Sequence, residues 1–177
     1  MTSRFCRVLG AAACAATLGM TLSSGVMAQE SDNRVSVTSD WAVFAEGDPK
    51  ECWGVSVPKE SVNTRDGQPV TVRRGDILLF VTYRAGKPGE VSFTGGYPFA
   101  PDSTVQVNID GATFEMTVKD EWAWPKDPAA DAQLLTAMKN GGQAVLTARS
   151  GKGTQTQDTF SLRGFTAAMT EAEAQCK

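Results

Sequence analysis

The chain contains no histidine. Imidazole is the base of Ser-His-Asp and Cys-His nucleophilic sites and a ligand in most zinc sites, so its absence argues against these classes of enzyme and metal centre. Carboxylates remain as candidate acids and bases, but they stand mostly at expected turns, where Asp is favoured for backbone reasons. We therefore expect no catalytic residue, no metal ion and no cofactor.

Long apolar runs are missing beyond the N-terminus. Two arginines precede an uncharged, Ala-rich segment at residues 8–22, and Val26-Met27-Ala28 fits the small-x-small pattern of a signal peptidase site. This predicts a signal peptide over residues 1–28, cleaved from a single domain over residues 29–177. No later segment approaches the roughly 18 to 20 apolar residues of a membrane helix. We expect a periplasmic or secreted protein without a membrane span.

The chain also lacks an excess of positive charge. Its 17 Lys and Arg stand against 20 Asp and Glu, for a formal net charge of −3, and two of the arginines belong to the expected signal peptide. Nucleic acids and anionic membrane surfaces attract basic proteins. Neither is therefore an expected partner.

Cysteine is scarce in the expected mature chain, where only Cys52 and Cys176 follow the cleavage site. In an oxidising compartment, two thiols without other metal-ligating neighbours most often form a disulfide. A disulfide between Cys52 and Cys176 would close a loop that spans most of the expected mature chain. Closing this loop would stabilise the fold by roughly 4 to 5 kcal/mol in the chain-entropy model. The alternative is two free thiols.

Short β-branched and aromatic segments alternate with turn residues along most of the chain. Asp110-Gly111 between two alternating segments is a strong hairpin signal. Asp127 followed by Pro128 predicts a helix start, and a second short helix begins at Phe165. The fold class is mainly β, an antiparallel β-sandwich or flattened barrel with two short helices, one of them C-terminal. The expected strands are residues 41–44, 52–57, 70–73, 77–83, 90–93, 104–109, 113–118, 143–148 and 156–162, with 32–39 as a lead-in or edge strand and 58–63 as a connection; the run 77–83 is apolar enough for burial on both faces.

Two expected aromatic loops, residues 95–101 and 121–125, carry the candidate binding residues. Trp122 and Trp124 are two positions apart, so in an extended segment they share one side, and the loop with Tyr97 and Phe99 would add to them. Such a platform suits a sugar or a peptide. The competing interpretation is that these rings cap the end of the core, and Trp41 and Trp53 are expected in the core as well.

Two basic motifs have a structural and a functional interpretation. Gly151-Lys152-Gly153-Thr154 superficially resembles a phosphate-binding loop, but the first glycine of that motif is missing and strands flank the segment, so we interpret it as a hairpin turn. The pair Arg73-Arg74 would recognise an anion or would simply be solvated at a strand end.

The end of the chain resembles a known family. Trp41, Val43, Cys52 and above all Ser-Leu-Arg-Gly-Phe-Thr-Ala-Ala-Met at residues 161–169 are similar to the invasion-associated locus B family of exported alphaproteobacterial proteins. The resemblance covers nearly all of the expected mature chain and implies a β-rich periplasmic or surface protein without a known catalytic activity. The family's name reflects a link to host-cell invasion in a pathogenic relative. Many members carry further cysteines, whereas here Phe44 follows Val43, so the family's full disulfide pattern does not carry over.

Three functional hypotheses follow. The first is a non-enzymatic protein of the cell envelope that binds a protein or glycan, of the envelope or of a host surface, through its loops. The second is a hydrolase that uses carboxylates on an envelope polymer. The third is a purely structural or stress-related periplasmic protein without a ligand.

Overall fold

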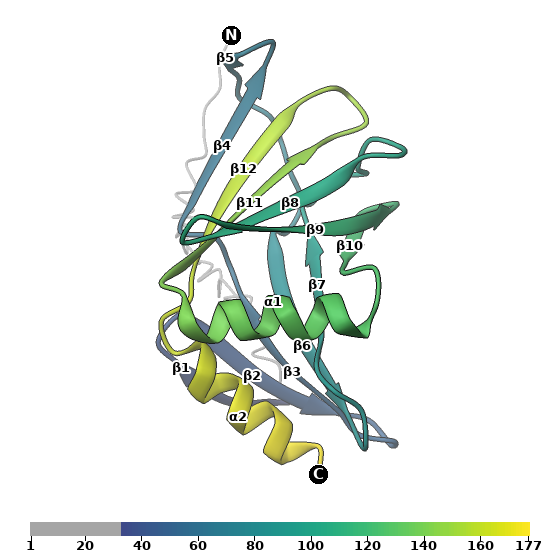
Figure 1. Ribbon diagram of the computed structural model, residues 1–177, viewed down its shortest axis with the longest axis vertical. Helices are drawn as coiled ribbons and strands as arrows, with labels where there is room; N and C mark the ends of the chain where they lie inside the picture. Colours follow the sequence, from purple (N-terminus) through teal and green to yellow (C-terminus); the bar gives the residue numbers. More distant parts are fainter. Residues whose placement is uncertain (1–32) are drawn as a thin grey trace, which may run out of the picture. The chain divides into compact units, whose positions relative to one another are not determined.

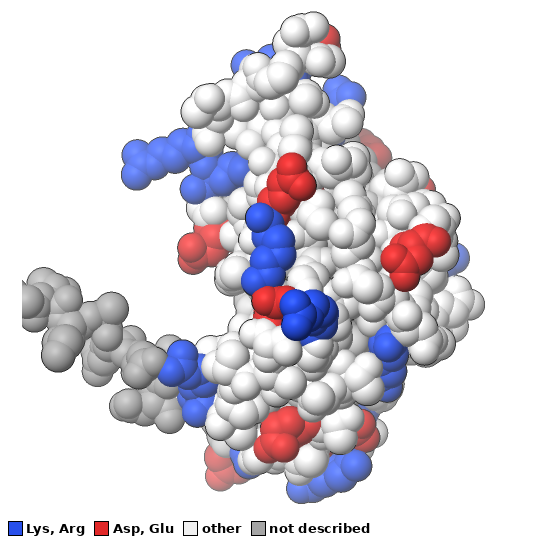
Figure 2. Space-filling view, turned by 90° about the vertical axis from the view of Figure 1, so that its left-hand side faces the viewer, with Lys and Arg blue, Asp and Glu red and all other residues white. Residues whose placement is uncertain are grey.

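The computed structural model describes residues 33–177 (Figure 1), which belong to one compact unit that spans Ser31–Lys177. The expected signal peptide, residues 1–28, lies outside the described residues. On the face shown in Figure 2, acidic and basic side chains lie interspersed on a mostly uncharged surface. No helix within residues 33–177 has the length and hydrophobicity to cross a membrane.

The described chain builds a single sheet in which every pairing is antiparallel, in the order β1-β2-β3-β6-β7-β10-β9-β8-β11-β12-β4-β5. The strands are β1 (Arg34–Thr38), β2 (Trp41–Glu46), β3 (Glu51–Ser56), β4 (Glu60–Arg65), β5 (Gln68–Pro69), β6 (Leu78–Arg84), β7 (Glu90–Thr94), β8 (Thr104–Ile109), β9 (Ala112–Lys119), β10 (Trp122–Trp124), β11 (Gln143–Arg149) and β12 (Gln155–Ser161).

The sheet folds over onto itself without closing. Phe93 on β7 and Phe160 on β12 are far apart in the strand order, yet their ring centroids are 6.1 Å apart. Figure 1 shows the two halves, with β4, β12, β11 and β8 in one and β1, β2, β3 and β6 in the other. Side chains from both halves fill one core. The predicted mainly β, antiparallel fold with two short helices is thereby confirmed, in the form of one folded sheet.

Two helices complete the domain, α1 (Pro128–Asn140) and α2 (Phe165–Gln175). Asp127 caps α1, because its Oδ1 accepts a hydrogen bond of 2.8 Å from the backbone N–H of Ala130. α2 follows the last strand and packs against β1, β2, β3 and β6 (Figure 1). Its buried residues, Phe165, Ala168, Met169 and Ala172, recur at helical spacing.

Three local predictions were wrong. Residues 58–63 were expected to connect strands, but β4 lies there and pairs with β12; its side chains are mostly polar and none is buried, so the usual alternation of apolar and polar residues is absent. Residues 70–73 were expected to form a strand, but the chain leaves the sheet there, and Gly75 donates a backbone hydrogen bond to Gly96 O. β6 was expected to be buried on both faces, but only alternate residues are buried.

Candidate functional site

Trp122 and Trp124 lie side by side on the outer face of the folded sheet. The prediction of a loop at this position was wrong, since both belong to the short strand β10, which pairs with β7 and β9. Ala123 between them is fully buried, whereas the two tryptophans are 43% and 40% exposed. They share one side, as their spacing predicts, and they do not cap the core.

Phe99 lies inside the fold, and Tyr97 is half-buried against it. Phe99 is 5% exposed, and its ring centroid is 5.2 Å from that of Tyr97 and 6.0 Å from that of Phe93. The Tyr97 hydroxyl shares a hydrogen bond of 2.5 Å with Thr156 Oγ1. Burial raises the pKa of the Tyr97 phenol, while this hydrogen bond and the charge of Arg74 act in the opposite direction. The core-capping interpretation therefore holds for Phe99, whereas the half-buried Tyr97 packs against the core and also lines a cavity; the structure joins neither ring to the tryptophans.

Other aromatic side chains extend the surface around the tryptophans. Phe80 on β6 contacts Trp122, with ring centroids 5.8 Å apart. On the same side of β2 and β3, Phe44 stacks on Trp53 at 5.7 Å. These five residues form the outer aromatic face: Phe44, Trp53, Phe80, Trp122 and Trp124.

The expected burial of Trp53 in the core was wrong, because Trp53 is only partly buried on the outer face. A signal for this was present in the sequence. Cys52 has to point inward to reach a distant partner, and its neighbour on a strand then points outward. Trp41, by contrast, is fully buried, as expected.

A cavity of about 470 Å³ opens beside Trp124, between β7 and the start of α1. Carboxylates from both elements line it. Asp131 Oδ1 accepts a hydrogen bond of 2.8 Å from the backbone N–H of Val91, Asp127 Oδ1 caps α1, and Glu90 Oε2 pairs with Arg84. Because each of these contacts engages one named oxygen, the second oxygen of each carboxylate remains available as an acceptor.

Asp131 has the most perturbed environment of these carboxylates. Burial raises its pKa, and the negative charges of Glu90 and Asp127 raise it further, against the lowering effect of the Val91 N–H. Within residues 33–177, no group of three or more acidic or cysteine side chains is arranged to hold a metal ion. Separately, the carboxylate oxygens in the lining can accept hydrogen bonds from hydroxyl groups, and they lie beside the Trp124 ring.

Arg73 and Arg74 have different environments. Arg73 is exposed, but Arg74 forms a bidentate ion pair with Asp158, at 2.8 Å and 2.6 Å, and their side chains are only 6% and 0% exposed. Arg74 also donates from Nε to Gly95 O, and its guanidinium lies 5.1 Å from the centre of the Tyr97 ring. The interpretation of the pair as simply solvated was therefore wrong for Arg74.

The disulfide expected from the sequence is present. Cys52 on β3 and Cys176 at the end of α2 are bonded through sulfur at 2.05 Å, at a sequence separation of 124. Both side chains are buried. The bond fastens the end of the C-terminal helix to the inner face of the sheet and fits an extracytoplasmic location.

The residues that carry the family resemblance also pack on one another. The Trp41 ring meets Phe165 edge to face at 4.9 Å, and Trp41 Nε1 donates a hydrogen bond of 3.0 Å to Ser161 O. This contact holds the start of α2 against β2. The motif at residues 161–169 therefore has a structural role in packing α2 on the sheet.

A family model described as invasion associated locus B (IalB) protein matches residues 41–173. The chain belongs to the IalB family. The crystal structure of invasion associated protein B from Bartonella henselae is similar over 78% of this chain and 95% of that chain, with 15% sequence identity and a TM-score of 0.53. This likeness shows a shared fold. No curated protein matches the chain. The IalB family is not known as a family of enzymes. The assignment of the chain to this family from its sequence is confirmed.

Proposed function

We propose that residues 1–28 direct the export of this IalB-family protein and are removed from it, and that the mature protein acts in the cell envelope as a non-enzymatic glycan-binding protein. The observation that carries the proposal is the pair of exposed tryptophans on one side of β10. Large aromatic side chains are usually buried, and exposed ones are frequent at binding surfaces. Export is supported by the buried disulfide, because such bonds persist in oxidising compartments.

A glycan fits the chemistry of this region better than a protein. A sugar ring presents C–H groups on its faces, which suit the flat indole rings, and hydroxyl groups at its edge, which need acceptors. The cavity beside Trp124 supplies acceptor oxygens from Glu90, Asp127 and Asp131. Its volume lies in the range of small-molecule sites. The surface therefore combines aromatic rings with hydrogen-bond acceptors, the two kinds of group that a polyhydroxylated ligand requires.

Binding without turnover is favoured by how the carboxylates are held. Glycoside hydrolysis needs one carboxyl group as acid and another as base or nucleophile across the scissile bond. Here Asp127 caps a helix, Asp131 binds a backbone N–H, and Glu90 pairs with Arg84, so all three have structural partners. The binding experiment described next therefore also tests the hydrolase hypothesis.

The test is a titration of the mature protein with neutral oligosaccharides prepared from cell-wall and outer-membrane polysaccharide, followed by calorimetry. Trp122→Ala/Trp124→Ala should weaken binding at least about 10-fold, the effect expected of aromatic hot spots. The matched control Val37→Ala/Val57→Ala also removes two exposed apolar side chains, which are 60% and 55% exposed, and should bind as wild type does.

Each other outcome contradicts part of the proposal. Equal binding by the tryptophan variant would remove the outer aromatic face as the glycan site. Shortened oligosaccharides after incubation would establish the hydrolase instead. Specific capture of an envelope protein by the wild type but not by the tryptophan variant, without glycan binding, would make the partner a protein.

A further inference from the structure

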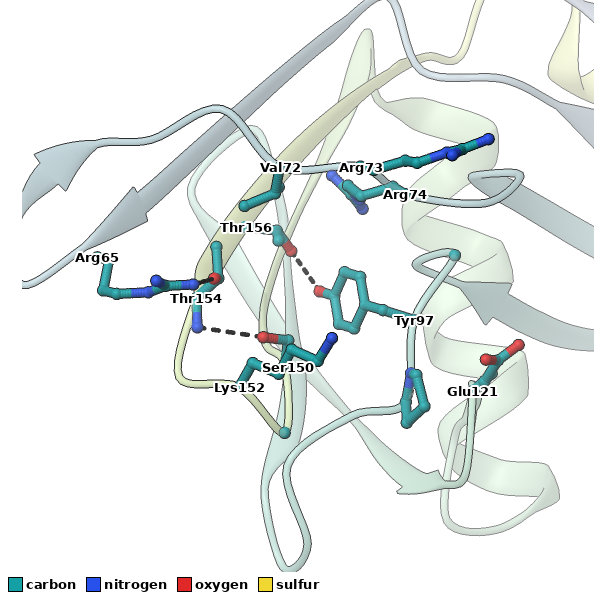
Figure 3. Close-up of a pocket in the computed structure, with 13 residues that line it drawn as sticks. Arg65, Val72, Arg73, Arg74, Tyr97, Glu121, Ser150, Lys152, Thr154 and Thr156 are labelled. Atoms are coloured by element: carbon teal, nitrogen blue, oxygen red, sulfur yellow. Dashed lines mark hydrogen bonds between the residues drawn. The ribbon is translucent and has the colours of Figure 1, made fainter.

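A second cavity, of about 540 Å³ (Figure 3), shares no lining residue with the outer aromatic face. Its lining comes from the turn between β11 and β12, the irregular segment that follows β5 and the loop that follows β7, together with Arg65 at the end of β4, Glu121 before β10 and Thr156 on β12. Its size is that of a site for a small molecule. The side chains used below are Arg65, Arg73, Arg74, Tyr97, Lys152 and Thr154.

Positive charge dominates the lining. Four basic residues face this cavity against one acidic residue, Glu121, although the whole chain has a formal net charge of −3. Arg74 is neutralised by Asp158. Arg65, Arg73 and Lys152 make no ion pair with a carboxylate in the described part of the chain. Cations gathered at a concave surface raise the local concentration of anions.

Arg65 is an exposed residue whose guanidinium is oriented at one side of the cavity by a hydrogen bond. It donates a hydrogen bond of 2.8 Å to Thr154 Oγ1, and Thr154 is only 4% exposed. The backbone N–H of Thr154 in turn donates to Ser150 Oγ at 3.1 Å. A guanidinium has five N–H donors, so most of the donors of Arg65 remain for a ligand. Fixing the side chain beforehand lowers the entropy cost of binding.

The other cations stand around a rigid aromatic wall. In Figure 3 the Lys152 side chain extends in the direction of Tyr97, whereas Arg73 extends to the side away from Arg65. Tyr97 is fixed by its hydrogen bond to Thr156 and by the Arg74 guanidinium near its ring. Pro98 and Val72 add apolar surface. The cavity thus combines cations with an apolar wall.

We propose that this second cavity binds a small organic anion. Its phosphate or carboxylate group would be held by Arg65 and Lys152, and the body of the molecule would lie against Tyr97 and Pro98. Arg73 adds positive charge at the rim, and Arg74 is a positioning residue that fixes Tyr97. Arginine suits phosphate and carboxylate groups because its planar fork can donate two parallel hydrogen bonds. This site is separate from the proposed glycan surface at Trp122 and Trp124.

The test compares three probes that differ only at one carbon of the sugar: glucose 6-phosphate, glucuronate and glucose. Calorimetric titration of the mature protein should detect binding of at least one of the two anions and none of glucose at the same concentrations. The affinity should fall as salt is added, because the contacts are ionic. Arg65→Gln/Lys152→Gln should weaken binding at least 10-fold, a loss of about 1.4 kcal/mol.

Two control proteins separate this site from general electrostatics and from the glycan site. Lys87→Gln/Lys139→Gln removes the same charge outside the cavity and should bind the anion as wild type does. Trp122→Ala/Trp124→Ala should also retain anion binding, so failure of the glycan proposal leaves this proposal standing. Anions that bind no better than glucose, or an equal loss in the Lys87→Gln/Lys139→Gln control, would overturn it.

The source of the anion is distinguished with vesicles. If the anion is a lipid headgroup, the protein should co-sediment with phosphatidylglycerol vesicles but not with phosphatidylcholine vesicles, and Arg65→Gln/Lys152→Gln should abolish this. Binding of the sugar anions without sedimentation identifies a free small molecule. Both results support an anion site in this cavity. If Arg65→Gln/Lys152→Gln still co-sediments with phosphatidylglycerol vesicles, the result counts against the site.

Discussion

Arg74 and Asp158 form an ion pair that is almost completely shielded from water. Their side chains are 6% and 0% exposed, and Asp158 Oδ1 also accepts a hydrogen bond of 2.7 Å from Ser61 Oγ. Burying two charges costs several kcal/mol per ion in lost hydration, which the mutual attraction and the added hydrogen bonds offset. Removing one partner should therefore destabilise the domain by more than the intact ion pair stabilises it.

We predict that Arg74→Met destabilises the domain by about 3 to 5 kcal/mol, because Asp158 is left as an uncompensated buried charge. The free energy of unfolding in urea measures this loss. Arg74→Met/Asp158→Leu should be more stable than Arg74→Met alone, because it leaves no buried charge.

The exposed pair of Arg84 and Glu51 provides the comparison for this prediction, with side chains that are 38% and 47% exposed. Arg84→Met should cost less than about 1 kcal/mol, since exposed ion pairs contribute little. Equal losses for Arg74→Met and Arg84→Met would mean that burial of the first pair has no energetic consequence.

The sequence contained a signal for this ion pair that the analysis of Arg73-Arg74 missed. On β12, Thr156, Asp158 and Phe160 share one side, and Phe160 is a core residue. A charge in phase with core residues has to find a partner. Which residue provides it could not be predicted, because Arg74 comes from a segment without regular structure, 84 positions away. That Trp122 and Trp124 share one side followed from their spacing, but their exposure on the outer face did not.

Elements with strong local signals were predictable, and those that depend on distant partners were not. Asp127 and Pro128 marked the start of α1, and Asp110-Gly111 marked the β8–β9 hairpin, because caps and tight turns are determined by neighbouring residues. β4 and β10 were missed. β4 is polar and is formed by pairing with β12, and β10 has only three residues.

Gly164 links β12 to α2. The structure of this junction depends clearly on this one residue. Its φ is +81°, and a Cβ at this position would lie 2.3 Å from the backbone oxygen of Thr38. A side chain therefore requires both a left-handed backbone and a shift of β1. We predict that Gly164→Ala destabilises the domain by more than the roughly 1 to 2 kcal/mol that the left-handed backbone alone costs.

Gly153, in the β11–β12 turn, allows the cost of the left-handed backbone to be measured without a close contact of the new side chain. Its φ is +80°, nearly the same, but a Cβ there would meet nothing within 4 Å. Gly153→Ala should therefore show only the backbone cost. Thermal unfolding of both variants measures the difference, and equal shifts in Tm would show that close contact with β1 adds nothing.

At the scale of the whole domain, the fold class was predictable and the strand order was not. Alternating short strands indicate two packed β layers, but which edges meet depends on pairings between distant segments. β3 pairs with β6 and not with β4, the next strand, while β4 pairs with β12 at the other end of the domain. The resemblance at residues 161–169 was informative because these residues hold α2 against the sheet.

The disulfide joins the same two parts covalently, since Cys52 belongs to β3 and Cys176 ends α2. We predict that Cys52→Ala/Cys176→Ala lowers the free energy of unfolding by up to about 5 kcal/mol, because the unfolded chain gains the entropy that a loop closed over 124 positions had lost. Chemical denaturation of wild type and variant measures this difference.

Reduction with dithiothreitol under denaturing conditions provides an independent form of the same experiment. Refolded in the presence of the reductant, the wild type should fall to the stability of Cys52→Ala/Cys176→Ala, whereas the variant should not respond, because it has no bond to lose. α2 would still be held by Trp41, Phe165 and Met169, all of which are buried. A domain that stays folded but weaker would therefore show that the bond reinforces this packing, whereas an unchanged unfolding free energy would contradict the predicted role of the bond.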